Sequence, residues 1–131
     1  MKVVIVGGVA GGASAAARLR RLNEEAQIVM FERGEFISFA NCGLPYYVGG
    51  TIPKRASLLV QTPKAMHSRF KIDVRTLSEV IGVFPAAQEV EVQDLRSGET
   101  YRENYDYLVL APGAAPFVPP IPGIDLAHVF T

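Results

Sequence analysis

The stretch KVVIVGGVAGGASAA, residues 2–16, is the part of the sequence that best indicates the fold of the chain. Residues 2–6 form a β-branched run that stops at two glycines, which is typical of a strand buried on both faces of a sheet. From Gly11 to about Asn23 the sequence is rich in Ala, Leu and Arg and has no proline, so it predicts a helix. Residues 27–32, QIVMFE, repeat the buried-strand pattern. Together these segments predict a βαβ unit with parallel strands and the glycine turn at the carboxyl end of the first strand.

Short elements are expected in the rest of the chain. Thr62 is suited to cap a helix and Pro63 to open it, so a short helix is expected there. From Ile72 onward the pattern changes to short strands, and residues 88–104 alternate apolar and polar side chains around a Ser-Gly turn, which favours a β-meander hairpin. Residues 107–110 predict another buried strand, followed by an irregular linker.

The expected fold class is therefore α/β, a Rossmann-like βαβ domain with a β-meander insertion. The size of 131 residues and the 49% hydrophobic content fit one globular domain. The 13 basic and 13 acidic residues balance, so no overall field attracts nucleic acid or an anionic membrane. The apolar run at the N-terminus is too short for a signal peptide or a membrane span, and we expect a cytoplasmic protein.

The sequence has one cysteine, which excludes an internal disulfide framework and a multi-thiolate metal site. We expect no metal. The two histidines, His67 and His128, stand alone and are interpreted as surface or packing residues. A single thiol has to act alone or with an external partner.

The glycine turn favours a diphosphate site. Gly7 and Gly12 fit the outer positions of a GxGxxG spacing, whereas Val9 occupies the middle one. Free N–H groups at the start of the helix would bind the anion. Glu32 ends the second strand, where an acid of a dinucleotide-binding unit takes the ribose hydroxyls; the alternative for Glu32 is a solvated charge.

Ser14, Arg18 and Arg21 are spaced by four and three residues, so they lie along one stripe of the predicted helix and Arg20 points elsewhere. Such a stripe is either a second anion site or an exposed helix face.

Cys42 has two interpretations from its neighbours. It sits in SFANCGLPYY, residues 38–47, between Asn41 and Gly43. If Gly43 to Pro45 open a helix, the thiol lies at its N-terminus, where the dipole favours the thiolate. The alternative is a thiol packed in the core.

Three segments together carry a family resemblance: VIVGGVAGGASAAARLRRLNE (4–24), FERGEFISFANCGLPYY (31–47) and YDYLVLAPGAAP (105–116). They resemble the FAD-dependent pyridine nucleotide-disulfide oxidoreductases, in the single-cysteine branch that includes coenzyme A-disulfide, persulfide and polysulfide reductases. The pattern Ser-Phe-Ala-Asn-Cys at 38–42 is the most specific part. NADH oxidases and peroxidases look similar but tend to have Ser before the cysteine, so Asn41 favours the reductases.

The resemblance implies site residues. Contacts to FAD are implied for Gly7, Val9, Ala10, Gly11, Gly12, Glu32, Arg33, Val80, Ala111, Pro112 and Gly113. Contacts to a coenzyme A-linked substrate are implied for Ser14, Arg18, Arg21, Ser38 and Asn41, with Cys42 as the catalytic residue. The family's lysine near the end of the helix that starts at Thr-Pro is replaced by Phe70, flanked by Arg69 and Lys71.

The implied activity is reduction of a small-molecule disulfide or persulfide by NAD(P)H through the flavin and Cys42. Members of the family are normally several hundred residues long and homodimeric. Residues 1–131 are therefore expected to be the N-terminal portion of an FAD-binding domain, with the nicotinamide-binding and dimerisation domains outside this chain and no turnover by the chain alone. Two alternatives stay open: an NADH oxidase or peroxidase acting through a Cys42 sulfenic acid, and a nucleotide-binding module without redox chemistry.

Overall fold

The computed structural model describes residues 1–130 of the chain. Within these residues the elements follow one another as β1 (Lys2–Val6), α1 (Ala10–Leu22), β2 (Gln27–Glu32), η1 (Asn41–Gly43), α2 (Leu44–Val48), η2 (Arg55–Leu58), α3 (Pro63–Phe70), β3 (Ile72–Thr76), β4 (Ser78–Phe84), β5 (Glu89–Asp94), β6 (Thr100–Asn104) and β7 (Tyr107–Leu110), where η marks a 3-10 turn.

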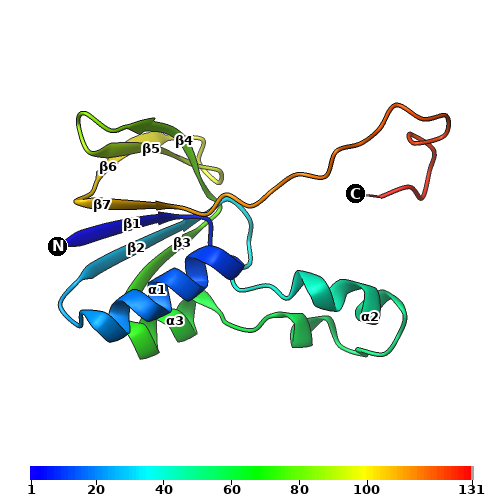
Figure 1. The fold of residues 1–131 in the computed structure, drawn as a ribbon, viewed down its shortest axis with the longest axis horizontal. Helices are drawn as coiled ribbons and strands as arrows, with labels where there is room; N and C mark the ends of the chain where they lie inside the picture. The colour runs from blue at the N-terminus through cyan, green and yellow to red at the C-terminus, as the bar shows by residue number, and fades with distance from the viewer. Residues whose placement is uncertain (131) are drawn as a thin grey trace.

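A parallel sheet in the order β3-β2-β1-β7 forms the centre of the molecule (Figure 1). β1 and β2 are parallel and joined through α1, which confirms the predicted βαβ unit. Side chains alternate between the two faces of these strands: Ile5 packs on the side of α1 and α3, and Val4 packs on the opposite side. Both strands are buried because each face of the sheet is covered, by helices on one side and by the antiparallel sheet on the other.

The predicted strand at 107–110 is present as β7, but it is not a buried strand. β7 pairs with β1 alone and forms an edge of the sheet. Tyr107 is 61% exposed and Leu110 is 59% exposed, whereas Leu108 and Val109 pack against the two cores. The apolar residues of this segment predicted a buried strand, but at the edge of the sheet two of its four side chains are exposed to solvent.

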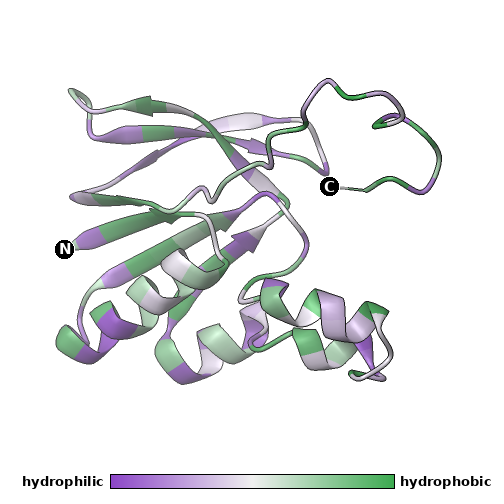
Figure 2. Cartoon of the chain, turned by 45° about the vertical axis from the view of Figure 1, so that its right-hand side comes forward, coloured by the Kyte–Doolittle hydropathy of each residue, from purple (hydrophilic) through white to green (hydrophobic). Residues whose placement is uncertain are grey.

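Strands β4, β5 and β6 form a separate antiparallel sheet, called the meander below. Its turn at Ser97 and Gly98 and its β5–β6 pairing confirm the predicted hairpin. Val90 and Val92 point inward and pack with Val29 and Phe31 of the parallel sheet. Figure 2 shows hydrophobic residues along the central strands and a mixed pattern along the meander, as expected for a sheet with one solvated face.

Helix α3 begins as predicted, because the Thr62 hydroxyl accepts a hydrogen bond from the Ala65 N–H at 3.2 Å and Pro63 is the first helical residue. Its end is tied to α1 by Arg20, whose guanidinium donates to the carbonyls of Phe70 at 2.7 Å and Lys71 at 3.2 Å. The same group donates to the carbonyl of Ala26 at 2.7 Å. Arg20 therefore joins the carboxyl ends of both helices to the start of β2.

Two segments extend away from the sheets. The first contains η1, α2 and η2 and projects beyond the helices (Figure 1). The second runs over residues 111–130, where the structure has neither a helix nor a strand, in agreement with the predicted linker. Across residues 1–130, no helix has the length and apolar character that a bilayer crossing requires.

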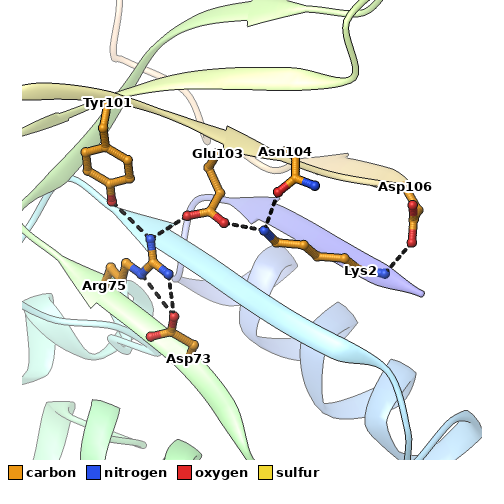
Figure 3. Close-up of polar contacts among 7 residues, drawn as sticks. All are labelled: Lys2, Asp73, Arg75, Tyr101, Glu103, Asn104 and Asp106. Carbon is orange, nitrogen blue, oxygen red and sulfur yellow. Dashed lines mark hydrogen bonds and ion pairs between the residues drawn. The ribbon is translucent and has the colours of Figure 1, made fainter.

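A polar network joins the meander to the parallel sheet (Figure 3). Glu103 of β6 accepts hydrogen bonds from the ammonium of Lys2 in β1 and, at 2.6 Å, from the guanidinium of Arg75 in β3. Arg75 also pairs with Asp73 at 2.7 Å and donates to the Tyr101 hydroxyl at 3.2 Å. The Glu103 side chain is only 13% exposed, so its charge depends on these two cations.

The network favours the ionised form of Glu103. Burial raises the pKa of Glu103, but hydrogen bonds from Lys2 and Arg75 and their positive charges outweigh burial and hold it below the ordinary value. A carboxyl group whose pKa is lower in the folded state stabilises the fold above the unfolded pKa. That stabilisation is lost as the pH falls through the folded pKa.

We predict that Glu103→Gln lowers the free energy of unfolding by about 1–3 kcal/mol at neutral pH, because two cations lose a charged acceptor. The difference from the wild type should shrink as the pH falls below the ordinary pKa of a glutamate, about 4.3, because the pKa of Glu103 is lowered in the folded state. Urea unfolding at several pH values measures both effects. Glu99→Gln, at an exposed position before the same strand, is the control and should change stability by less than about 0.5 kcal/mol. A deficit that stays constant with pH would contradict this account.

Candidate functional site

The turn between β1 and α1 has no room for side chains at two of its glycines. Gly7 has φ +95°, and a Cβ there would lie 2.0 Å from the carbonyl oxygen of Ala111. A Cβ on Gly12 would lie 1.7 Å from the carbonyl oxygen of Gly7. Backbone atoms of three segments are therefore in direct contact here: the end of β1, the first turn of α1 and the end of β7.

The start of α1 is open to an anion. The residue before the helix, Val9, makes no side-chain capping bond, and no acidic residue stands in the first turn. N–H groups at the start of a helix have no intrahelical partners, and the helix dipole favours negative charge there. This end of α1 fits a phosphate or diphosphate group.

A first hollow of about 120 Å³ lies at the carboxyl ends of the strands. Its lining comes from β1, β2, β4 and the segment after β7: Val6, Gly7, Phe31, Glu32, Arg33, Ser78, Glu79, Val80 and Pro112. Five of the residues predicted for the cofactor, Gly7, Glu32, Arg33, Val80 and Pro112, are thus gathered in one place. Ligands of open parallel sheets bind at this edge.

Glu32 is held in place by backbone groups. Its two carboxylate oxygens accept hydrogen bonds from the N–H of Gly8 and the N–H of Gly34, each at 2.8 Å. Arg33, 73% exposed, lies 3.9 Å from Glu79 across the hollow. The hollow therefore has an oriented carboxylate and an exposed cation at its rim, which suits hydroxyl groups and a polar ring.

The remaining residues predicted for the cofactor do not line this hollow. Val9 and Ala10 line a second hollow instead. Gly11 faces the side chain of Ala111, and the Ala111 N–H donates to the carbonyl of Val6 at 2.8 Å. Gly113 follows with φ +76° and is exposed.

The second hollow, of about 290 Å³, runs between α1 and α3. It is lined by Val9, Ala10, Ala13, Ser14, Ala17, Arg21, Ser38, Gln61, Met66 and Phe70. Three residues predicted for the substrate, Ser14, Arg21 and Ser38, are brought together here. Arg18 and Asn41 are exposed and do not line it.

Cys42 is exposed, so the structure does not support a packed core thiol. It lies in the turn η1, one residue ahead of Gly43, and the helix that follows, α2, has only five residues. The thiol thus precedes a short helix rather than starting a long one. Ser38, four residues earlier, has φ +49°, and its N–H donates to the carbonyl of Gly8 at 2.8 Å. This strained residue connects the cysteine segment directly to the glycine turn.

Sequence reasoning missed several lining residues. Met66 and Phe70 are four apart in a helix whose start was predicted, so helical spacing could have placed both on one face. Gln61 and Glu79 lie in irregular or edge positions, and no local pattern marked them. Among residues 1–130, no cluster of His, Cys, Asp and Glu is arranged to hold a metal ion.

The sequence matches the pyridine nucleotide-disulphide oxidoreductase family over residues 1–131. A coenzyme A disulfide reductase from Staphylococcus epidermidis is 44% identical over 114 residues, which is 87% of this chain and 26% of that protein. This chain thus spans about a quarter of the length of the curated relatives it matches.

Solved structures agree in fold. Reduced Bacillus anthracis CoADR-RHD is 59% identical with a TM-score of 0.90, covering 94% of this chain and 22% of that one. A NAD-dependent persulfide reductase from A. fulgidus is 39% identical with a TM-score of 0.89, covering 95% and 23%. The water-forming NADH oxidase from Lactobacillus brevis is 33% identical with a TM-score of 0.87, covering 95% and 28%. The α/β fold class expected from the sequence is confirmed.

We predict that Gly12→Ala destabilises the protein by about 3 kcal/mol or more, because its Cβ cannot avoid the backbone of Gly7. Gly11→Ala is the matched control: the nearest atom to its Cβ is a side-chain carbon at 3.3 Å, and the change should stay within about 1 kcal/mol. Urea or thermal unfolding measures both. Equal effects of the two substitutions would show that the close approach is not what restricts position 12.

Proposed function

This chain belongs to the pyridine nucleotide-disulphide oxidoreductase family, and from that membership we propose that its protein is an FAD-dependent NAD(P)H reductase of coenzyme A disulfide or a related persulfide. Cys42 is the redox-active residue in this proposal. The relatives named coenzyme A disulfide reductase and persulfide reductase support the substrate class.

One observation carries the proposal: the exposed Cys42 follows Ser38 by four residues, and Ser38 lines a hollow that also contains Ser14 and Arg21. An exposed thiol is accessible to a disulfide in solution. Hydroxyl groups and a guanidinium suit an elongated, anionic thiol compound.

The residues also fit FAD. Gly7 and Gly12 let the end of β1, the start of α1 and the segment after β7 pack backbone against backbone, and the uncapped start of α1 beside them suits a diphosphate. In the first hollow, Glu32 and Arg33 would meet the adenosine ribose, and the backbone of Val80 the adenine. Val9, Ala10, Gly11 and Gly12 would line the diphosphate, with Ala111, Pro112 and Gly113 forming a second contact. When bound, the flavin supplies two-electron transfer from NAD(P)H to a disulfide.

The chain's own residues perform the sulfur chemistry. The Cys42 thiolate attacks one sulfur of the substrate disulfide, a Cys42–S–S bond forms, and the substrate S–S bond breaks with release of one thiolate, which takes up a proton. A hydride equivalent from NAD(P)H, two electrons and one proton, would then break the Cys42–S–S bond, restore the Cys42 thiolate and release the second thiol with the proton. Ser14, Arg18, Arg21, Ser38 and Asn41 would hold the substrate during the attack.

Further parts of the proposal come from the family resemblance. We propose that residues 1–131 form the N-terminal portion of the FAD-binding domain, and that the complete protein is a homodimer with a separate nicotinamide-binding domain. A thiol that works in its reduced form favours a cytoplasmic location.

A second candidate is an NADH oxidase or peroxidase. The 33% identical NADH oxidase from Lactobacillus brevis and the exposure of Cys42 favour it, because an accessible thiolate is oxidised to a sulfenic acid. Turnover with oxygen or peroxide in the absence of any disulfide would identify this activity.

In the complete protein, we predict that Cys42→Ser lowers NAD(P)H-dependent reduction of coenzyme A disulfide by about a thousandfold or more, because this chain has no second cysteine to replace the nucleophile. Flavin content should be unchanged, because Cys42 does not line the first hollow. Nicotinamide absorbance measures turnover and flavin absorbance measures cofactor content. Retained turnover in the variant would contradict the proposal.

A further inference from the structure

The cysteine segment, residues 38–43, pairs with the end of η2 and the residues after it through an antiparallel bridge. The Val60 N–H donates to the Ser38 carbonyl at 3.1 Å. The Ala40 N–H donates to the Leu58 carbonyl at 2.9 Å. These backbone bonds set the direction in which the chain enters η1, the turn that carries the cysteine.

Burial in the projecting part of the chain, which contains η1, α2 and η2, is confined to one contact (Figure 1). Between residues 38 and 65, Gly43 and Leu58 are the only buried residues, and Leu58 is 1% exposed. The two pack together, since a Cβ on Gly43 would lie 2.6 Å from Cδ2 of Leu58. The exposed Cys42 is therefore bonded directly to the one buried residue of its turn.

The backbone at Gly43 does not itself require a glycine. Its φ is −81° and its ψ is −16°, a conformation open to any residue. The next atom that a Cβ would meet, Cδ1 of Ile52, is at 3.6 Å, which is an ordinary contact, so Leu58 alone limits the space. Because Leu58 is buried and the turn is exposed at Asn41 and Cys42, an added methyl group moves the turn and the sulfur with it.

We propose that Leu58 is a positioning residue for the reaction of Cys42, because its side chain packs against Gly43 and fixes the direction of the thiol. This inference rests on the proposed function and adds to it the residue that orients the nucleophile. In the reaction, the Cys42 thiolate forms an S–S bond with one substrate sulfur while the substrate S–S bond breaks and its other half leaves as a thiolate. Such an attack depends on alignment, and a displacement of about 1 Å can lower a rate about a hundredfold.

A pair of substitutions that conserves volume tests the proposal in the complete protein. Gly43→Ala adds one carbon to the contact, Leu58→Val removes one, and the double variant restores the total. The rate at which Cys42 exchanges with coenzyme A disulfide should fall about tenfold in Gly43→Ala and about threefold in Leu58→Val. In the double variant it should return to within about twofold of the wild type. Leu95→Val, the same change at an exposed position between β5 and β6, is the control and should leave the rate unchanged.

Alkylation by iodoacetamide separates orientation of the thiol from folding. This small reagent needs an accessible thiolate but no bound disulfide, so its rate at Cys42 should stay within about twofold of the wild type in every variant. A protein that is merely destabilised would change both rates together. Mass spectrometry of the peptide that contains Cys42 measures both rates. Flavin absorbance should show unchanged cofactor content, because neither Gly43 nor Leu58 lines the first hollow.

The outcomes distinguish this inference from the proposed function. If wild-type Cys42 does not exchange with coenzyme A disulfide, the reductase is wrong and the positioning role is wrong with it. The role alone is wrong, and the reductase stands, if the wild type exchanges but Gly43→Ala matches it, if the double variant is no faster than Gly43→Ala, or if alkylation falls in step with exchange. If Gly43→Ala does not fold, Leu58→Val decides, and exchange at the wild-type rate would overturn the role.

Discussion

The contact of Gly12 with the Gly7 carbonyl is the constraint on which the rest of the molecule depends. A Cβ at position 12 would lie 1.7 Å from that oxygen, and one at position 7 would lie 2.0 Å from the Ala111 carbonyl oxygen. Because backbone meets backbone here, α1 starts directly behind the end of β1, and β7 ends beside the same turn. The uncapped start of α1 is thereby exposed at the carboxyl edge of the parallel sheet, where anionic ligands bind.

Gly8 connects the two hollows through its backbone. Its N–H donates to Glu32, which lines the first hollow, and its carbonyl accepts from Ser38, which lines the second. A Cβ on Gly8 would lie 2.7 Å from the Ile37 side chain, so this position also has little room. In the proposed reductase, the cofactor and the cysteine segment are therefore held against the same turn, which suits electron transfer between them.

Local sequence patterns were sufficient to predict most of the longer helices and strands. The runs at 2–6 and 27–32 are β1 and β2 to the residue, and Thr62 caps α3 as its position before Pro63 indicates. Strand pairing between segments far apart in the sequence could not be predicted from local patterns. Ile72–Thr76 joins the parallel sheet beside β2, although its sequence resembles that of the strands that follow. The network of Glu103 with Lys2 and Arg75 likewise joins three strands, and no single segment carries its pattern. For the site, the sequence identified the glycines, Glu32, Ser14 and Arg21. Phe70 and Gln61 could not be identified in this way, because they line the second hollow only through the packing of α3 against α1.

The central claim is that Cys42 exchanges with the disulfide of a coenzyme A-type substrate. Intact mass spectrometry after incubation with coenzyme A disulfide, without reductant, tests it most directly, because the sequence contains one thiol. The account predicts rapid gain of one coenzyme A moiety per chain at Cys42, faster than the corresponding gain from glutathione disulfide. An unmodified mass, or equal rates with both disulfides, would contradict it.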